Sequence, residues 1–109
     1  MKAKRFPLVR LEELPPGTCR SVETEAGWVA LYNVEGRIYA TDDVCPHAGG
    51  PLGEGQMKGD CVVCPWHGWR FNVKTGQRVD NPDFRVDCFD VTVEDGLIMA
   101  EIPLDRPGS

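Results

Sequence analysis

Two short motifs near the middle of the chain constrain its fold more than any other feature. The first motif, C-P-H, places Cys45 two residues before His47. The second motif, C-P-W-H, places Cys64 three residues before His67, and the protein has no other histidine. Thiolate sulfur and imidazole nitrogen are natural protein ligands of iron and zinc. The fold must therefore bring two loops together so that they offer four metal ligands.

The order of the ligands indicates which kind of metal site this is. Each motif supplies one cysteine and one histidine across a short gap, so both lie on one loop tip but reach different atoms. Zinc fingers instead pair cysteine with cysteine and histidine with histidine. The proline after each cysteine fixes φ and stiffens the loop tip. The pattern favours an iron–sulfur site, with a structural zinc site of Cys₂His₂ type as the alternative.

The rest of the chain shows the pattern of short β-strands. Apolar residues alternate in several runs, and 12 Gly and 9 Pro in 109 residues favour many turns. No segment keeps a helical period, although a single helical turn is predicted within residues 49–59. The predicted fold is all-β, an antiparallel sandwich or barrel. The predicted strands cover residues 7–11, 18–24, 27–34, 37–41, 59–63, 86–93 and 97–102, with hairpin turns at 35–36 and 94–96.

The segment that carries the motifs differs from the β-rich remainder. Residues 43–73 contain both histidines, three of the five cysteines and many glycines, so we expect loops mounted on a β framework. The chain has the length of one small domain. We therefore predict a single domain over residues 1–109, in which a ligand-bearing subdomain at about 43–73 is inserted.

Charge and hydropathy exclude several classes of function. The net charge is −5 and the Lys and Arg residues form no run, which argues against nucleic-acid binding. No apolar run approaches the roughly 20 residues that cross a bilayer, and residues 6–9 are too short for a signal-peptide core. We expect a cytoplasmic protein without membrane contact. The net negative charge would steer the protein toward a basic face on a partner, or it would simply keep the protein soluble.

Other residues near the motifs have less specific signals. An odd number of cysteines does not favour a disulfide framework, so Cys19, Cys61 and Cys88 are predicted to be small buried core residues. Phe71 is also predicted in the core, whereas Trp66 lies between two ligands and is predicted to be partly exposed as a docking patch. Solvated turn positions are predicted for Asp42, Asp43 and Glu54, and Pro82 is predicted in a plain turn or in a loop that covers the site.

The stretch CPH…CPWHGWRF closely resembles the Rieske [2Fe–2S] family, and the resemblance extends over the whole chain. The chain is most similar to the stand-alone Rieske-type ferredoxins of bacterial ring-hydroxylating dioxygenase systems. This resemblance implies antiparallel sheets with a cluster-binding subdomain at one tip and one cluster per chain. It also implies that Cys45 and Cys64 bind one iron, while His47 and His67 bind the other and lie near the surface.

Departures from the respiratory members of the family predict the reduction potential. Respiratory Rieske proteins carry an extra cysteine in each loop, which form a disulfide; here Gly50 and Trp66 occupy those places. They also donate hydroxyl hydrogen bonds to the cluster from positions that Trp69 and Phe71 occupy here. Hydrogen bonds to sulfur raise the potential of the cluster. We therefore predict a potential near the low end of the Rieske range, about −150 mV rather than about +300 mV.

The resemblance implies an electron carrier and not an enzyme. It would take single electrons from a flavin-dependent NAD(P)H reductase and pass them to a terminal oxygenase, while the cofactor carries the chemistry. The alternative is a small Rieske subunit of a nitrite reductase or of another oxidoreductase complex. Many such subunits have lost the cluster ligands, which are all present here. A redox or metal sensor ranks last, because the chain offers no effector domain or DNA-binding surface.

Overall fold

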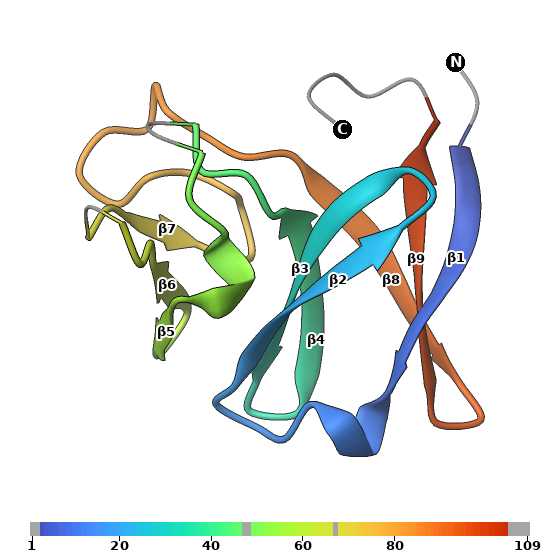
Figure 1. Cartoon of the computed structure of the whole chain (residues 1–109). Coiled ribbons are helices and arrows are strands. Elements are labelled where there is room, and N and C mark those ends of the chain that lie inside the picture. Colours follow the sequence, from blue (N-terminus) through green and yellow to red (C-terminus); the bar gives the residue numbers. More distant parts are fainter. Residues whose placement is uncertain (1–2, 47–48, 67, 105–109) are drawn as a thin grey trace.

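The computed structural model of the chain describes residues 3–46, 49–66 and 68–104, which fold into two antiparallel sheets (Figure 1). The large sheet has the strand order β1-β9-β8-β4-β3-β2, and the small one has the order β5-β6-β7. Within the described residues, no helix is long and apolar enough to cross a membrane. The elements are β1 (Ala3–Arg10), η1 (Leu11–Glu13), β2 (Cys19–Thr24), β3 (Gly27–Val34), β4 (Arg37–Asp42), η2 (Leu52–Glu54), β5 (Gln56–Lys58), β6 (Cys61–Val63), β7 (Arg70–Asn72), β8 (Cys88–Glu94) and β9 (Leu97–Pro103).

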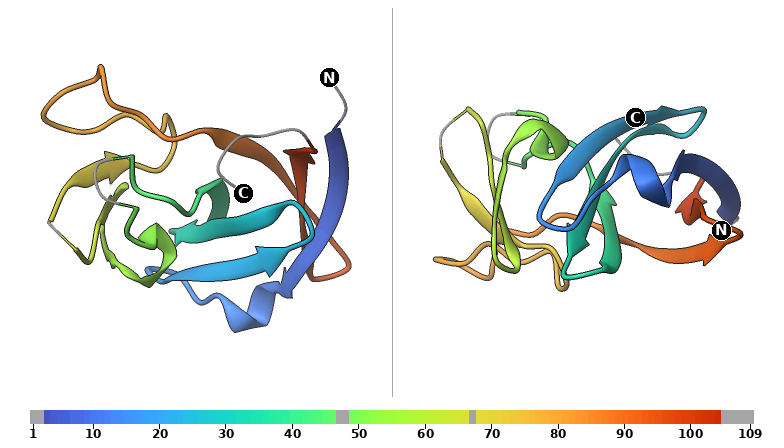
Figure 2. Two further views of the ribbon diagram at one scale, coloured as in Figure 1. Left: turned by 45° about the horizontal axis from the view of Figure 1, so that its top comes forward. Right: turned by 90° about the horizontal axis from the view of Figure 1, so that it is seen from below.

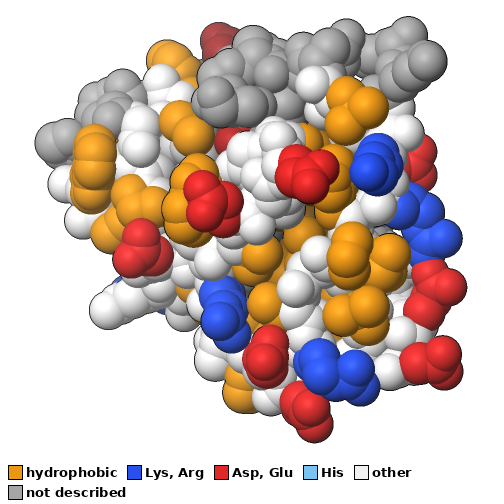
Figure 3. Space-filling model, turned by 45° about the vertical axis from the view of Figure 1, so that its right-hand side comes forward, with side chains coloured by type: hydrophobic (Ala, Val, Ile, Leu, Met, Phe, Trp, Pro, Cys, Tyr) orange, Lys and Arg blue, Asp and Glu red, His pale blue; other side chains and the backbone are white. Residues whose placement is uncertain are grey.

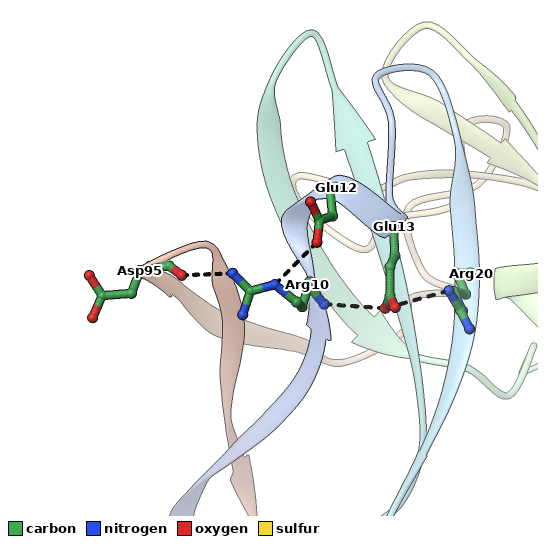
Figure 4. Close-up of polar contacts among 5 residues, drawn as sticks. All are labelled: Arg10, Glu12, Glu13, Arg20 and Asp95. Atoms are coloured by element: carbon green, nitrogen blue, oxygen red, sulfur yellow. Dashed lines mark hydrogen bonds and ion pairs between the residues drawn. The ribbon is translucent and has the colours of Figure 1, made fainter.

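The large sheet curls until its edge strands, β1 and β2, approach each other around η1 (Figures 1 and 2). A polar network marks this closure (Figure 4). The Glu13 carboxylate accepts a hydrogen bond from the Arg10 backbone N–H at 3.3 Å and pairs with Arg20 of β2 at 3.9 Å. The Arg10 guanidinium also donates to the carbonyl oxygen of Asp95 at 3.1 Å. These side chains are half exposed, so the network orders the edges but adds little stability.

Both predicted hairpins are confirmed. Strands β3 and β4 pair through the turn at Glu35 and Gly36, and β8 and β9 pair through the turn at Asp95 and Gly96. The two central residues of each turn have positive φ, as a type I′ turn requires. The predicted strand bounds differ from the observed ones by only one or two residues here. The first strand, however, begins at Ala3 and not at residue 7, because β1 pairs with β9 along its length.

Strand β3 is buried on both faces and separates two hydrophobic cores. Val29 and Leu31 point into the first core, inside the curled sheet, whereas Ala30, Tyr32 and Val34 point into the second core, toward the small sheet. This explains why the strand is a nearly continuous apolar run and not an alternating one. The first core contains Phe6, Leu14, Ala26, Val29, Leu31, Ala40, Phe89, Ile98, Ala100 and Ile102. The second core contains Ala30, Tyr32, Val34, Cys45, Leu52, Val62, Cys64, Phe71, Val73 and Val86.

The small sheet lies beside the curled sheet, within the range 43–73 (Figures 1 and 2). Its middle strand β6 agrees with the predicted strand at 59–63, and η2 agrees with the helical turn predicted within 49–59. Strands β5 and β7 were missed, because three residues are too few to show a period of two. The boundaries of a separate subdomain stay a prediction.

The surface of the curled sheet carries charges of both signs. Figure 3 shows Lys and Arg side chains interspersed with Asp and Glu side chains on the face over β1 and β2, with apolar side chains between them. No patch of a single sign dominates this view. This face therefore offers no strong local field for a charged partner.

Candidate metal centre

The first ligand loop connects β4 to η2 and is closed at its base by backbone hydrogen bonds. Val44 and Pro51 form an isolated antiparallel bridge. The Cys45 N–H donates to the Gly50 carbonyl oxygen at 2.9 Å, and the Gly49 N–H donates to the Cys45 carbonyl oxygen at 2.8 Å. The loop is thus tied on both sides of Cys45.

The second ligand loop is the tip of the hairpin between β6 and β7. Val63 and Arg70 are the last paired residues below it. The Cys64 N–H donates to the Trp69 carbonyl oxygen at 2.7 Å, and the Gly68 N–H donates to the Cys64 carbonyl oxygen at 3.1 Å. The first loop has the same two hydrogen bonds. In each loop the N–H of the glycine four residues after the cysteine donates to the cysteine carbonyl oxygen, and the cysteine N–H donates to the carbonyl oxygen of the residue after that glycine.

The shared pattern explains the glycine at the same place in both loops. Gly49 has φ of 78° and Gly68 has φ of 76°, a backbone conformation that other residues rarely adopt. Each loop therefore turns back on its cysteine in the same way. The two histidines differ in their spacing from the cysteine: His47 is two residues after Cys45, and His67 is three residues after Cys64. His47 and His67 lie outside the described residues, so their positions stay a prediction.

The two loops meet at their cysteine ends. A Cβ atom at Gly50 would lie 3.0 Å from the Cys64 sulfur and 2.9 Å from Trp66 Cγ, so a larger residue at Gly50 would have to displace one of them. Cys45 and Cys64 are 1 % and 2 % exposed, and neither forms a disulfide. Two buried cysteines on adjoining loops, with Gly50 of the first loop against Cys64 of the second, fit a metal centre with two thiolate ligands.

Asp43 fastens the first loop to the framework, contrary to the prediction of a solvated turn residue. It is only 4 % exposed. Its carboxylate accepts hydrogen bonds from the Ser21 hydroxyl at 2.9 Å and from the Gly53 N–H at 2.7 Å, and its carbonyl oxygen accepts one from the Leu52 N–H at 2.7 Å. The sequence gives no signal that Asp43 would be buried in this way, because its hydrogen-bond partners Ser21 and Gly53 come from β2 and η2. Asp42 is half-buried and Glu54 is exposed.

Cys19 lies at the junction between β2 and the loop region. Its thiol donates to the carbonyl oxygen of Gly55 at 3.3 Å and packs against the second core. Desolvation by burial, with the nearby negative charge of Asp43 as a smaller cause, raises the pKa of Cys19 from 9.0 to about 11. The thiol therefore stays protonated at neutral pH, and a packing role agrees with its half-buried position.

The two other cysteines differ from each other. Cys61 is half-buried on β6 and belongs to neither core, so the prediction that it is a buried core residue is wrong. The prediction that Cys88 is buried is wrong: it is exposed, because Phe89 takes the inward position on β8 and the next side chain along a strand points the other way. Burial of part of the side chain still raises the pKa of the Cys88 thiol.

The aromatic residues of the second loop agree with their predicted positions. Trp66 is 57 % exposed at the loop tip, and Phe71 is 1 % exposed in the second core. Trp69 is half-buried, with its ring centroid 6.3 Å from that of Phe71 and 5.1 Å from that of Phe84. Pro82 is exposed in the segment between β7 and β8, which bends over Trp69. The contact of Arg78 with Trp69 was missed, because no motif links the two residues.

Comparison with known proteins agrees with this geometry. The family model described as the Rieske [2Fe–2S] domain matches residues 4–90. The chain is 35 % identical over 103 residues to the ferredoxin component of the naphthalene 1,2-dioxygenase system of Pseudomonas aeruginosa, which covers 94 % of this chain and 99 % of that protein. It is 40 % identical over 88 residues to ferredoxin CarAc of Metapseudomonas resinovorans, covering 79 % and 82 % of the two chains.

Solved structures show the same fold. The ferredoxin in a complex of reduced oxygenase and oxidized ferredoxin of carbazole 1,9a-dioxygenase superposes with a TM-score of 0.81 at 34 % identity, over 88 % of this chain and 91 % of that one. A protein described as an NADH-dependent nitrite reductase small subunit from Mycobacterium tuberculosis superposes with a TM-score of 0.84 over 94 % and 98 % of the chains. Its identity of 22 % shows a common fold alone.

Proposed function

The chain belongs to the Rieske [2Fe–2S] family, and we propose that Cys45, His47, Cys64 and His67 are the ligands of its single cluster. The observation that carries this proposal is the pair of facing loops, each with one buried cysteine that forms no disulfide and the same closing hydrogen bonds. In this assignment the two thiolates bind one iron and the two imidazoles bind the other. The glycine contact between the loops brings Cys64 next to the first loop without a side chain in between.

The protein is an electron carrier, like the ferredoxin components that it matches over nearly their full length. The bound cluster supplies one-electron redox chemistry. The chain itself binds and orients that group, and the burial of both cysteines keeps water away from the sulfur atoms. We propose that the electron comes from a flavin-dependent NAD(P)H reductase and goes to a terminal oxygenase.

The tip of the second loop is suited to docking. Trp66 is 57 % exposed, and Val44 beside the first loop is 41 % exposed, so both loops present apolar surface. The net charge of −5 complements a basic face on a redox partner. A transient contact of this kind would bring the predicted histidine ligands close to the partner.

An EPR spectrum of the dithionite-reduced protein, with assays of iron, sulfide and zinc, tests the ligand assignment. We expect a rhombic Rieske signal with two irons and two sulfides per chain. His47→Ala, His67→Ala and Cys64→Ser should each abolish the signal, whereas Cys88→Ser, a matched change at an exposed cysteine, should preserve it. An unchanged spectrum in any of the first three variants, or one zinc per chain in the wild type, would refute the assignment.

A redox titration tests the suitability of the cluster for this route. The side chains at Trp69 and Phe71 provide no hydroxyl donor, so we expect a potential close to about −150 mV. Such a potential can be reached from a nicotinamide-dependent reductase. A potential close to about +300 mV would instead indicate a quinol-type donor.

The nitrite reductase alternative receives support from the common fold alone. The ferredoxin relatives combine higher identity with coverage of nearly the whole chain, and these observations favour the carrier role. Co-purification with the catalytic subunit of a nitrite reductase in place of an oxygenase would reverse this order.

We also infer a cytoplasmic location. All five cysteines lie among the described residues and none forms a disulfide, as is usual in a reducing compartment. Fractionation of the source cells, with the protein found in the periplasmic or membrane fraction, would contradict it.

A further inference from the structure

The guanidinium of Arg78 lies against an aromatic pair beside the second ligand loop. Its Cζ atom is 3.5 Å from the ring centroid of Trp69 and 5.9 Å from that of Phe84. The Trp69 and Phe84 rings meet edge to face at 5.1 Å. Attraction between a cation and the face of an indole ring is strongest where water is partly excluded. We refer to Arg78, Trp69 and Phe84 as the Arg78 stack.

No neighbour among the described residues neutralises the charge in the Arg78 stack. The Arg78 Nε atom is buried and has no hydrogen-bond partner within the part of the chain that the structure describes. No ion pair of Arg78 occurs among those residues either, whereas nearby Arg70 is paired with Asp80 at 3.4 Å. The positive charge therefore acts on its surroundings without a compensating carboxylate from residues 3–46, 49–66 or 68–104.

Backbone hydrogen bonds hold the Arg78 stack in place. The Arg78 N–H donates to the Phe84 carbonyl oxygen at 2.8 Å, which closes the segment between them into a compact loop. The Val79 N–H donates to the Arg70 carbonyl oxygen at 2.9 Å, and Arg78 forms a bridge with Phe71 of β7. The guanidinium is thus attached to the same hairpin that carries the second ligand loop.

The Arg78 stack reaches the proposed ligand Cys64 through one residue. The Trp69 carbonyl oxygen accepts the hydrogen bond from the Cys64 N–H that closes the loop, at 2.7 Å. The indole ring of the same residue carries the guanidinium on its face. A fixed positive charge consequently lies one indole ring away from the backbone that holds a cluster ligand.

We propose that Arg78 is a positioning residue whose charge, held on Trp69, raises the reduction potential of the cluster. The proposal rests on the proposed function, because it requires a cluster at the two loops. Reduction adds one negative charge to the centre, and a nearby partly buried cation stabilises that charged state more than the oxidised one. In an acidic chain, Arg78 would offset the general negative field at the point where the electron resides.

An EPR-monitored redox titration of the cluster-loaded full chain tests this proposal. Arg78→Met removes the charge but keeps an unbranched apolar side chain on the indole face, and we expect a lower midpoint potential. Arg78→Lys keeps the charge and should stay close to the wild type. Arg37→Met, at an exposed arginine that begins β4, is the matched control and should leave the potential unchanged.

The outcomes separate this proposal from the proposed function. A wild-type chain that binds no iron overturns both. A fully loaded Arg78→Met protein with the potential of Arg37→Met overturns only the role of Arg78, and so does a fall in Arg78→Lys as large as in Arg78→Met. Arg78→Gln provides a second neutral side chain. If Arg78→Met and Arg78→Gln both lose the cluster, Arg78→Lys provides the test. A fully loaded Arg78→Lys protein at the wild-type potential supports the proposal, and one with a lower potential refutes it.

Discussion

The curled sheet and the loop region are built from different interactions. The framework consists of β1–β4, β8 and β9, whose strands have six to eight residues, around the entirely hydrocarbon first core. The loop region, residues 43–73, has strands of three residues, and the second core beneath it includes the thiols of Cys45 and Cys64. One region is organised by apolar burial, and the other by backbone closures, the Asp43 contacts and the bound group.

This difference indicates which region of the molecule cluster binding stabilises. The long strands of the framework bury a large apolar core, which stabilises them directly, whereas strands of three residues bury little apolar area of their own. A metal group that binds only the folded loops adds its binding energy to their stability. The framework should therefore fold without the cluster, and the loop region should depend on it.

Removal of the cluster is expected to produce the largest effect. In the apo-protein, amide hydrogen exchange should accelerate across the loop region, while β3, β4 and β9 keep their protection, because local opening follows local stability. Mass spectrometry of peptides from holo- and apo-protein measures this. Equal acceleration in both regions would mean that the molecule has a single cooperative unit.

Leu31→Ala should damage the framework directly. Leu31 is fully buried in the first core, and its truncation leaves a cavity that costs about 2–5 kcal/mol. Urea unfolding followed by far-UV circular dichroism should show this loss in holo- and apo-protein alike. Val93→Ala, at an exposed position on β8, should change the stability by less than about 0.5 kcal/mol. A loss confined to the holo-protein would contradict the division between the regions.

Asp43→Ala should loosen the loop region by an intermediate amount. The change leaves the Ser21 hydroxyl and the Gly53 N–H without their acceptor, at a cost of about 1–3 kcal/mol. We expect the cluster to be lost faster on mild heating, and the decrease in visible absorbance measures the rate of loss. The exposed neighbour Glu54 provides the control, and Glu54→Ala should have no such effect. Equal rates of loss in the two variants would show that Asp43 does not fasten the loop.

High pH should weaken the junction between the regions modestly. Cys19 has a pKa of about 11 in the folded protein, against 9.0 for the ordinary thiol, so the native state binds its proton more tightly. The resulting stability is complete below pH 9.0 and is lost as the pH rises toward 11. The free energy of unfolding should fall less over this range in Cys19→Ser. Parallel pH profiles would exclude this contribution.

Trp66→Ala should have the smallest effect on stability and a clear effect on binding. Because the side chain is 57 % exposed, we expect less than about 0.5 kcal/mol in unfolding. Loss of an aromatic contact should weaken docking to a terminal oxygenase by about 1–2 kcal/mol, measured by calorimetry. Val93→Ala, at an apolar residue on β8 that is 42 % exposed, serves as the control. Equal weakening in both variants would place the docking surface beyond the loop tip.

Several features could be predicted from local pattern. Acidic-glycine turns between β-rich runs predicted both hairpins, and the exposure of Trp66 followed from its place at the loop tip. Cys88 was misplaced because alternation alone does not say which of the two phases faces inward. That choice is made when Phe89 packs into the first core.

The sequence by itself determined the all-β class, the two loops that carry the C-P-H and C-P-W-H motifs and the family of the protein, because these depend on local turn chemistry and on spacing along the chain. Only the tertiary structure decided that Asp43 is buried against Ser21, that Gly50 lies against Cys64, and that Arg78 lies on Trp69. Each of these contacts joins segments that no short pattern connects. They form only when β3 has one core on each face and the loops close over the second one.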